Sequence, residues 1–282
     1  MNFTEKAILF GCAGESLVGI LARPAEPLDS GVVVIVGGPQ YRAGSHRQFV
    51  LLSRALAAAG HAVLRFDYRG MGDSTGELHN FENISPDIKS AINALQAAVP
   101  GLRDVVLWGL CDGASAALLY CHAAQDSRVR GLCLLNPWVR SATSLAKTHV
   151  KHYYTERLRQ KEFWAKLISG RVTWRALAGL AQNLRAALRP HPELATAAFH
   201  DRMAVAWKSF DGPILLLLSG DDYTAMEFLE HAGSSTSWTG ALKKNALVQH
   251  LEPGADHTLS EIRFNSVIEK CTLTLLRQLA LH

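Results

Sequence analysis

Residues 104–115 read Asp-Val-Val-Leu-Trp-Gly-Leu-Cys-Asp-Gly-Ala-Ser, and this stretch decides the fold. Its first half is a short apolar run typical of a strand, and the small residues after Gly113 favour a helix. Glycines at 109 and 113 flank Cys111 in a Gly-x-Cys-x-Gly pattern, the cysteine form of a nucleophile elbow. The pattern predicts that Cys111 stands in a sharp turn, with its sulfur at the amino end of the helix.

The charge around Cys111 calls for a basic partner. The amino end of a helix carries unpaired N–H groups and the positive end of the dipole, which favour a thiolate over a thiol. The neighbouring Asp112 acts in the opposite direction, because a nearby carboxylate disfavours a second anion. Without a basic group, Cys111 would be a buried structural cysteine, which is the alternative interpretation.

Length and composition describe a folded protein. A chain of 282 residues suits one large domain, or one domain with an inserted subdomain. A hydrophobic content of 48% with 19% charged residues excludes a disordered chain. The five cysteines are scattered, with no Cys-x-x-Cys pair and no zinc-ligand spacing, so we expect no metal site. With no basic leader and no apolar run of about 18 residues, we expect a cytoplasmic protein without an integral membrane segment.

Strand and helix patterns alternate on both sides of the elbow. The β-branched run at residues 31–36 is typical of a strand buried on both faces in a mostly parallel sheet. This alternation predicts an α/β fold with right-handed crossovers. We expect an opening hairpin at 5–24, further strands at 61–67, 129–135, 212–219 and 246–251, and helices at 47–59, 85–99, from 224, and at 259–280.

Residues 138–205 change character. The stretch from Thr143 to His191 reads as two or three amphipathic helices, and between Trp138 and His191 there are 11 Lys or Arg against 2 Glu. This excess of positive charge fits a solvated face, or attraction of an anionic substrate, carrier or membrane surface. The predicted organisation is a first core part (1–137), a helical lid (138–205) and a second core part (206–282).

Three polar residues follow successive predicted strands: Cys111, an aspartate at 221 or 222, and His257. The carboxyl ends of parallel strands meet at one edge of a sheet, so these side chains should converge. His257 would take the thiol proton, the aspartate would orient the imidazole, and the thiolate would attack a carbonyl carbon. The alternatives are a helix N-cap for either aspartate and a solvated loop position for His257.

Several motifs resemble the α/β-hydrolase superfamily: Asp-Tyr-Arg-Gly-Met-Gly-Asp-Ser at 67–74, the elbow, and Gly-Ala-Asp-His at 254–257. More narrowly, residues 37–42, 44–48 and 109–112 resemble the exosortase A system-associated hydrolase 1 family, over nearly the whole chain. This resemblance implies a bacterial cytoplasmic hydrolase, encoded alongside exopolysaccharide and protein-sorting systems, with an undefined substrate. It also implies an α/β-hydrolase fold, in which a mostly parallel eight-stranded sheet is flanked by helices and a helical lid follows the sixth strand.

The resemblance favours Asp222 over Asp221 as the acid, because the superfamily's acid usually follows a glycine by two or three positions. The oxyanion hole needs two backbone donors, of which the first is the N–H of Asp112. The second should come from the loop after the third strand, where Pro39 has no N–H to give, so we assign it to Gln40.

Basic residues on that same loop are candidates for substrate binding. Arg42, His46 and Arg47 could hold an anionic group of the substrate, or they could be ordinary surface charge. Asp67 to Ser74 is expected to be structural, with glycines that permit a tight turn.

We therefore predict a thiol-dependent hydrolase that cleaves an ester or thioester through an acyl-enzyme, without metal or organic cofactor. Its substrate would be a small-molecule acyl compound, anionic or carrier-bound. Acyl transfer on the same triad is the close alternative, and a non-catalytic binding protein on a hydrolase scaffold is the alternative from another class. Nucleic-acid binding, suggested only by the basic residues of 138–205, is not expected. The sequence does not determine the oligomeric state.

Overall fold

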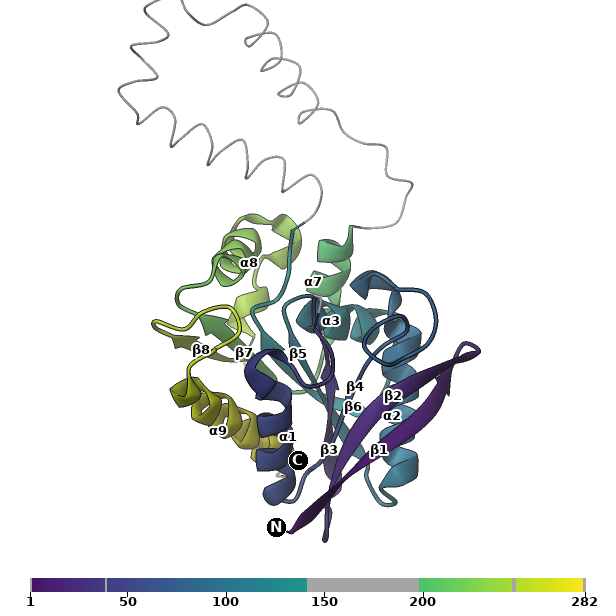
Figure 1. Ribbon diagram of the computed structural model, residues 1–282. Coiled ribbons are helices and arrows are strands. Elements are labelled where there is room, and N and C mark those ends of the chain that lie inside the picture. The colour runs from purple at the N-terminus through teal and green to yellow at the C-terminus, as the bar shows by residue number, and fades with distance from the viewer. Residues whose placement is uncertain (1, 39, 141–197, 245–246, 281–282) are drawn as a thin grey trace, which may run out of the picture. The chain divides into compact units, whose positions relative to one another are not determined.

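The protein folds around one eight-stranded sheet with helices on both faces (Figure 1). The computed structural model describes residues 2–38, 40–140, 198–244 and 247–280. The chain divides into two compact units, the first made of Met1–Val139 and Ala197–His282 and the second of Arg140–Thr196. Of the predicted lid, residues 141–197 lie outside the described residues. The first unit carries the sheet.

The sheet is antiparallel at one edge and parallel elsewhere. Its order is β1-β2-β4-β3-β5-β6-β7-β8, in which β1 pairs antiparallel with β2 and β2 with β4, while the other neighbours are parallel. The predicted hairpin and the mostly parallel sheet of eight strands are confirmed. The strands are β1 (Phe3–Cys12), β2 (Glu15–Pro24), β3 (Ser30–Ile35), β4 (Ala62–Phe66), β5 (Asp104–Leu110), β6 (Val129–Leu135), β7 (Ile214–Ser219) and β8 (Leu247–Glu252).

Two hydrophobic cores cover the two faces of the sheet. Every residue of β3 is buried, as its β-branched sequence predicts for a strand covered on both sides. Successive side chains alternate between the cores, so that Val33 and Ile35 belong to one and Val32 and Val34 to the other. The strand cannot shift by one residue without exchanging both sets.

The helices divide between these faces. Helices α1 and α9 lie side by side on one face, and α2, α3, α7 and α8 contribute to the core of the other (Figure 1). No helix in the described ranges is both long and apolar enough to cross a membrane. The helices are α1 (Gln48–Ala58), α2 (Ser85–Ala98), α3 (Asp112–Ala124), α7 (Phe199–Ser209), α8 (Tyr223–Ser234) and α9 (Ile262–Leu279).

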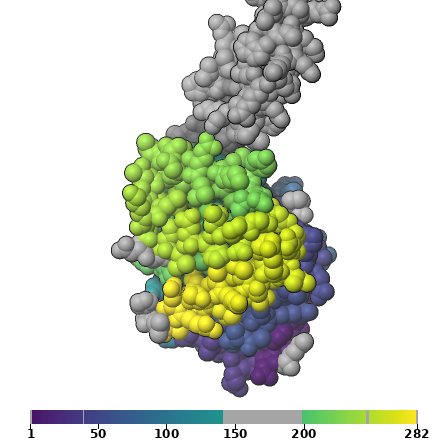
Figure 2. Space-filling model, turned by 90° about the vertical axis from the view of Figure 1, so that its left-hand side faces the viewer, coloured from purple at the N-terminus to yellow at the C-terminus, as the bar shows by residue number. Residues whose placement is uncertain are grey.

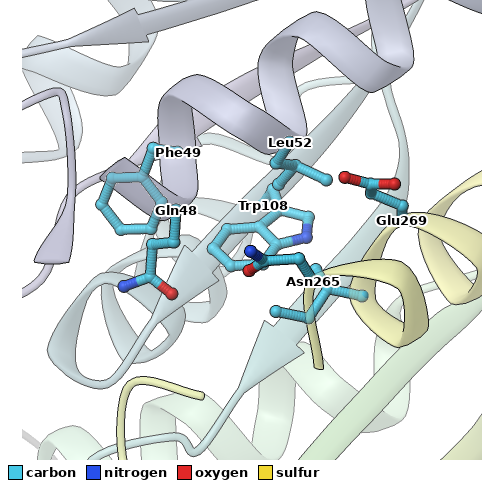
Figure 3. Close-up of a pocket in the computed structure, with 7 residues that line it drawn as sticks. Gln48, Phe49, Leu52, Trp108, Asn265 and Glu269 are labelled. Carbon is cyan, nitrogen blue, oxygen red and sulfur yellow. The ribbon is translucent and has the colours of Figure 1, made fainter. Parts of the chain in front are cut away.

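On the strand that leads to the elbow, the side chain of Trp108 packs between α1 and α9. Trp108 of β5 is buried, and its ring meets that of Phe49 edge-on at a centroid distance of 5.7 Å. Its indole N–H donates to the Thr272 hydroxyl of α9 at 3.3 Å. Figure 3 shows Trp108 between Phe49 and Leu52 of α1 and Asn265 of α9. These contacts fix the position of β5 just before Cys111.

Helix α7 belongs to the core although it begins inside the range predicted for the lid. Its Trp207 is fully buried, with its ring centroid 5.4 Å from that of Trp238, and α7 contacts α3. The predicted boundary at residue 205 therefore falls within a core helix. Figure 2 shows how the C-terminal part of the chain, green to yellow, forms one side of this unit.

A matched pair of glycine substitutions tests the packing. A Cβ at Gly212 would overlap the Arg130 carbonyl oxygen, whereas a Cβ at Gly233 in α8 would have no atom within 4 Å. We expect Gly212→Ala to lower the free energy of unfolding by about 1–3 kcal/mol. Gly233→Ala should raise it by up to about 1 kcal/mol, because alanine loses less backbone entropy in a helix. Urea unfolding measures both, and equal stabilities would contradict the packing described here.

Candidate active site

Cys111 forms the turn between β5 and α3. Its φ of 59° and ψ of −124° lie where residues with a Cβ are rarely found, and such a conformation costs about 1–3 kcal/mol. The Cys111 N–H donates to the Leu135 carbonyl at 2.8 Å, and the Cys111 carbonyl accepts the N–H of Trp138 at 3.2 Å. These bonds fasten the strained turn to the end of β6.

The two glycines of the elbow are needed for close approach. A Cβ at Gly109 would lie 2.5 Å from the Ala114 nitrogen, and a Cβ at Gly113 would lie 2.5 Å from the Ile35 carbonyl oxygen. Ordinary Cβ contacts are much longer, so only glycine lets α3 start this close to β3 and β5. The predicted sequence of strand, turn and helix is therefore present at this motif.

Asp222 stands at the start of α8 and contacts His257. Its carboxylate accepts the N–H groups of Thr224 and Ala225 at 3.1 and 3.3 Å, which caps the helix. Its Oδ2 also lies 2.8 Å from Nδ1 of His257. Asp221, the alternative acid, is exposed, and its recorded contact is a backbone hydrogen bond to Ala255. Of the two aspartates, Asp222 is the one that can orient the imidazole.

His257 lies between Asp222 and Cys111. Hydrogen bonds with the Asp222 carboxylate and the Cys111 sulfur raise the pKa of His257 to about 10, against the opposing effect of burial. The imidazole is therefore protonated at neutral pH. The structure thus brings together the three residues that the sequence analysis selected, from the ends of β5, β7 and β8. We call Cys111, Asp222 and His257 the triad cluster.

Asn136 supports the triad cluster, and the sequence analysis had assigned it no role. It directly follows β6, is fully buried and has a positive φ of 46°. Its Nδ2 donates to the His257 carbonyl at 3.1 Å and to the Ser219 hydroxyl at 2.9 Å, while its Oδ1 accepts the Ser219 N–H at 2.8 Å. Asn136 therefore ties the loop that carries His257 to the ends of β6 and β7. The sequence feature that could have indicated this role is an amide side chain, able both to donate and to accept hydrogen bonds, directly after a buried apolar strand.

The loop after β3 lies against the start of α3. The Gly38 N–H donates to Oδ1 of Asp112 at 2.5 Å. The Oε1 of Gln40 accepts the Ser45 N–H at 3.3 Å, so this side chain organises its own loop. Pro39 lies outside the described residues. The assignment of oxyanion donors to the N–H groups of Gln40 and Asp112 stays a prediction.

Arg42 is committed to ion pairs. Its backbone N–H and guanidinium bind the buried Asp67, and its other guanidinium nitrogen contacts Asp73 at 2.5 Å. The segment from Asp67 to Ser74 thereby serves as a structural support, and Gly70 and Gly72 within it have positive φ.

His46 and Arg47 are exposed and precede α1 in a turn with positive φ at both residues. The His46 charge acts on Asp256, beside His257. Burial works to raise the pKa of Asp256, but hydrogen bonds from Ser260 and Thr258 and the His46 charge together lower it. The side chains of His46 and Arg47 are thus exposed to solvent, whereas the guanidinium of Arg42 is paired.

Within the described ranges, no group of three or more His, Cys, Asp or Glu side chains is arranged to bind a metal ion.

A family profile described as the alpha/beta hydrolase family matches residues 32–262, which include the triad cluster. The chain belongs to this family. By family, it is a hydrolase.

Solved structures of low sequence identity share the fold of this alpha/beta hydrolase. The esterase Pf2001 from Pyrococcus furiosus is 14% identical, with a TM-score of 0.66 over 98% of this chain and 91% of the esterase. Est1E from Butyrivibrio proteoclasticus, bound to ferulic acid, is 15% identical, with a TM-score of 0.63 over 96% of this chain and 99% of Est1E. Human protein ABHD12B is 36% identical over 113 residues, which are 38% of this chain and 29% of the human protein. The chain thus matches less than a third of that relative's length.

Removal of the Asn136 contacts should loosen His257. We expect Asn136→Ala to slow the alkylation of Cys111 by iodoacetamide about tenfold, since the imidazolium no longer stays beside the sulfur. Ser219→Ala is the matched control, because it removes one Asn136 partner and leaves the bond to His257, and its rate should stay within about twofold. Equal rates for the two variants would exclude a positioning role for Asn136.

The titration of His257 can be followed by NMR of labelled histidine. We expect a His257 pKa near 10 in the wild type. In Asp222→Asn the pKa should shift strongly downward, toward 6.5, because the hydrogen bond to the Asp222 carboxylate, the largest cause of the raised value, is lost. Asp221→Asn should leave the value unchanged. Because the folded-state pKa lies above the unfolded one, this group stabilises the fold fully below about pH 6.5, and the contribution is lost as pH rises through 10. A wild-type His257 pKa near 6.5 would refute the ion pair between His257 and Asp222.

Proposed function

We propose that this alpha/beta hydrolase cleaves an acyl ester or thioester, with Cys111 as nucleophile, His257 as acid and base, and Asp222 as the carboxylate that orients His257. One observation carries the proposal. The His257 imidazole is hydrogen-bonded to the Asp222 carboxylate, and its pKa is raised both by that carboxylate and by the sulfur of the strained elbow residue. A nucleophile requires an adjacent base that is oriented by a third group, and His257 between the Asp222 carboxylate and the Cys111 sulfur has this arrangement. A purely structural histidine does not require both partners.

In the acylation step, the Cys111 thiolate attacks the carbonyl carbon of the substrate. The carbonyl oxygen becomes an oxyanion, which accepts hydrogen bonds from the N–H of Asp112 and from the loop that carries Gln40. As the tetrahedral intermediate collapses, the bond to the leaving oxygen or sulfur breaks, and the imidazolium of His257 gives its proton to the leaving group. The products are a free alcohol or thiol and a thioester on Cys111.

In the deacylation step, neutral His257 takes a proton from water as the water attacks the thioester carbonyl. The second tetrahedral intermediate expels the Cys111 sulfur as thiolate, and an acid is released. Asp222 keeps Nδ1 of the imidazole engaged in both steps, so that the other ring nitrogen faces the sulfur. The cycle needs no metal or organic cofactor.

The basic residues near the site support an anionic acyl substrate, either small or attached to a carrier. His46 and Arg47 are exposed, and the His46 charge reaches the loop of His257. Arg42 contributes through Asp67 and Asp73, by holding the loop from which the other two project. A cytoplasmic location, and a link to exopolysaccharide and exosortase systems, stay predictions from the family resemblance of the sequence.

The nucleophile is tested by substitution. With p-nitrophenyl acetate and an acetyl thioester as substrates, Cys111→Ala should lower kcat/KM at least about 10³-fold. Mass spectrometry of the quenched wild type should show one acetyl group on Cys111. Cys121→Ala is the control, because Cys121 lies on α3, the helix that begins just after Cys111. Burial, together with the charge of Asp126, raises the pKa of the Cys121 thiol to about 12. Cys121→Ala should change kcat/KM less than about twofold.

Retained turnover in Cys111→Ala would overturn the covalent mechanism. Wild-type protein that neither turns over nor becomes acylated by any ester or thioester would favour a binding protein on this scaffold. Products formed with added alcohols or amines, instead of free acid, would indicate acyl transfer by the same triad cluster.

A further inference from the structure

The side chain of Asp112, the residue after Cys111, contacts the loop after β3. Its Oδ1 accepts the N–H of Gly38 at 2.5 Å. The backbone N–H groups of Gly113 and of Asp112 itself also act on this carboxylate, because both help to lower its pKa. A Cβ added to Gly37 would lie 2.6 Å from Oδ1, so the loop after β3 closes tightly on this group. Three backbone donors from two segments therefore meet at one carboxylate.

These donors are the kind that an oxyanion requires. The N–H of the residue after the nucleophile and an N–H from the loop after β3 should both point at the developing negative oxygen. A carboxylate oxygen is a charged acceptor of the same type, bound through the same backbone groups. In the free protein, the Asp112 carboxylate is bonded to the N–H of Gly38, which lies on the same loop as Gln40, and its own N–H also acts on it. A substrate oxygen that takes the Gly38 N–H as its second donor would have to displace the carboxylate.

We propose that the Asp112 carboxylate occupies the oxyanion-binding N–H groups of the free enzyme and acts as an internal competitor of the substrate carbonyl. This inference rests on the proposed cysteine mechanism and adds a specificity element to it. A neutral ester oxygen is a weaker acceptor than a carboxylate. Small esters are therefore poor substrates, whereas larger substrates that bind elsewhere on the protein can use that binding energy to displace Asp112.

The charges around Asp112 set the pH dependence of this competition. His257 faces it with a positive charge, the Cys111 sulfur adjoins it, and Tyr68 lies close enough to feel its charge. Burial raises the pKa of Asp112, although the three N–H groups and His257 act to lower it. Burial also raises the pKa of Tyr68 to about 12, with Asp112 and Asp87 adding to the effect, so this phenol stays neutral. As pH rises through the Asp112 pKa, the carboxylate forms and takes the N–H groups, and competition strengthens.

Three measurements on Asp112→Ala and Asp112→Asn test the proposal. We expect kcat/KM for p-nitrophenyl acetate at pH 8 to rise at least about tenfold in Asp112→Ala, with Asp112→Asn between the two. Alkylation of Cys111 by iodoacetamide, which needs no oxyanion hole, should change less than about threefold. Free acetate should inhibit Asp112→Ala competitively, and it should inhibit the wild type at least about tenfold more weakly, because the internal carboxylate already fills the site.

Asp221→Asn is the control for loss of one negative charge at this edge of the sheet, and its kcat/KM should stay within about twofold. A fall in kcat/KM in Asp112→Ala, with Cys111 still alkylated normally, would show that Asp112 assists the reaction and would overturn the proposal. An equal rise in acylation and alkylation would also overturn it, since that result reports a more reactive thiolate. If wild type and variants alike fail to acylate Cys111, the cysteine mechanism fails. In that case acetate protection of the Gly38 amide, read by NMR in Asp112→Ala against wild type, still decides whether the carboxylate occupies these donors.

Discussion

The strained backbone of Cys111 is the constraint on which the rest of the site depends. A positive φ at a residue with a Cβ persists only where the surroundings enforce it. Here the Leu135 carbonyl at the end of β6 and the Trp138 N–H just after it bind the turn, and the Trp108 side chain anchors the preceding strand against α1 and α9. The energy stored in one peptide turn is thus balanced by the packing of a central strand. In return, the sulfur is held at the edge of the sheet where the other loops converge.

The order of the strands explains why Asn136 carries so much of the arrangement. Strand β6 lies between β5, which leads to Cys111, and β7, which leads to Asp222. The residue that follows β6 therefore lies next to the end of β7, on the side from which the loop of His257 also comes. The Asn136 amide joins these two segments, since it donates to the His257 carbonyl and accepts from Ser219. An apolar residue there would leave these buried polar groups unsatisfied.

The sequence predicted the parts of the molecule that follow from local pattern. Continuous β-branched runs identified the strands, and the paired glycines around Cys111 identified the elbow. Both features depend on residues that are close together in the sequence, through backbone sterics and through the burial of consecutive side chains. It could not predict the ion pair of Arg42 with Asp67, which joins two loops and leaves Arg42 no longer a free basic residue. The role of Asn136 was not predicted for a related reason: the bonds of an amide depend on which loops are folded against it. The predicted boundary at residue 205 falls inside α7, which is amphipathic in sequence, as a lid helix would also be, and whose partner α3 is distant in sequence.

Two carboxylates flank one imidazole, and their surroundings give them different chemistry. Asp222 caps α8 and is bonded to Nδ1 of His257, so its charge always has partners on both sides. Asp112 has backbone N–H groups as partners, and burial raises its pKa, so the hydrogen bond from the N–H of Gly38 helps to keep it ionised. A substrate oxygen that takes this donor removes part of what keeps Asp112 ionised. Binding of a substrate oxygen at the Gly38 N–H and protonation of Asp112 are then coupled through the same N–H group.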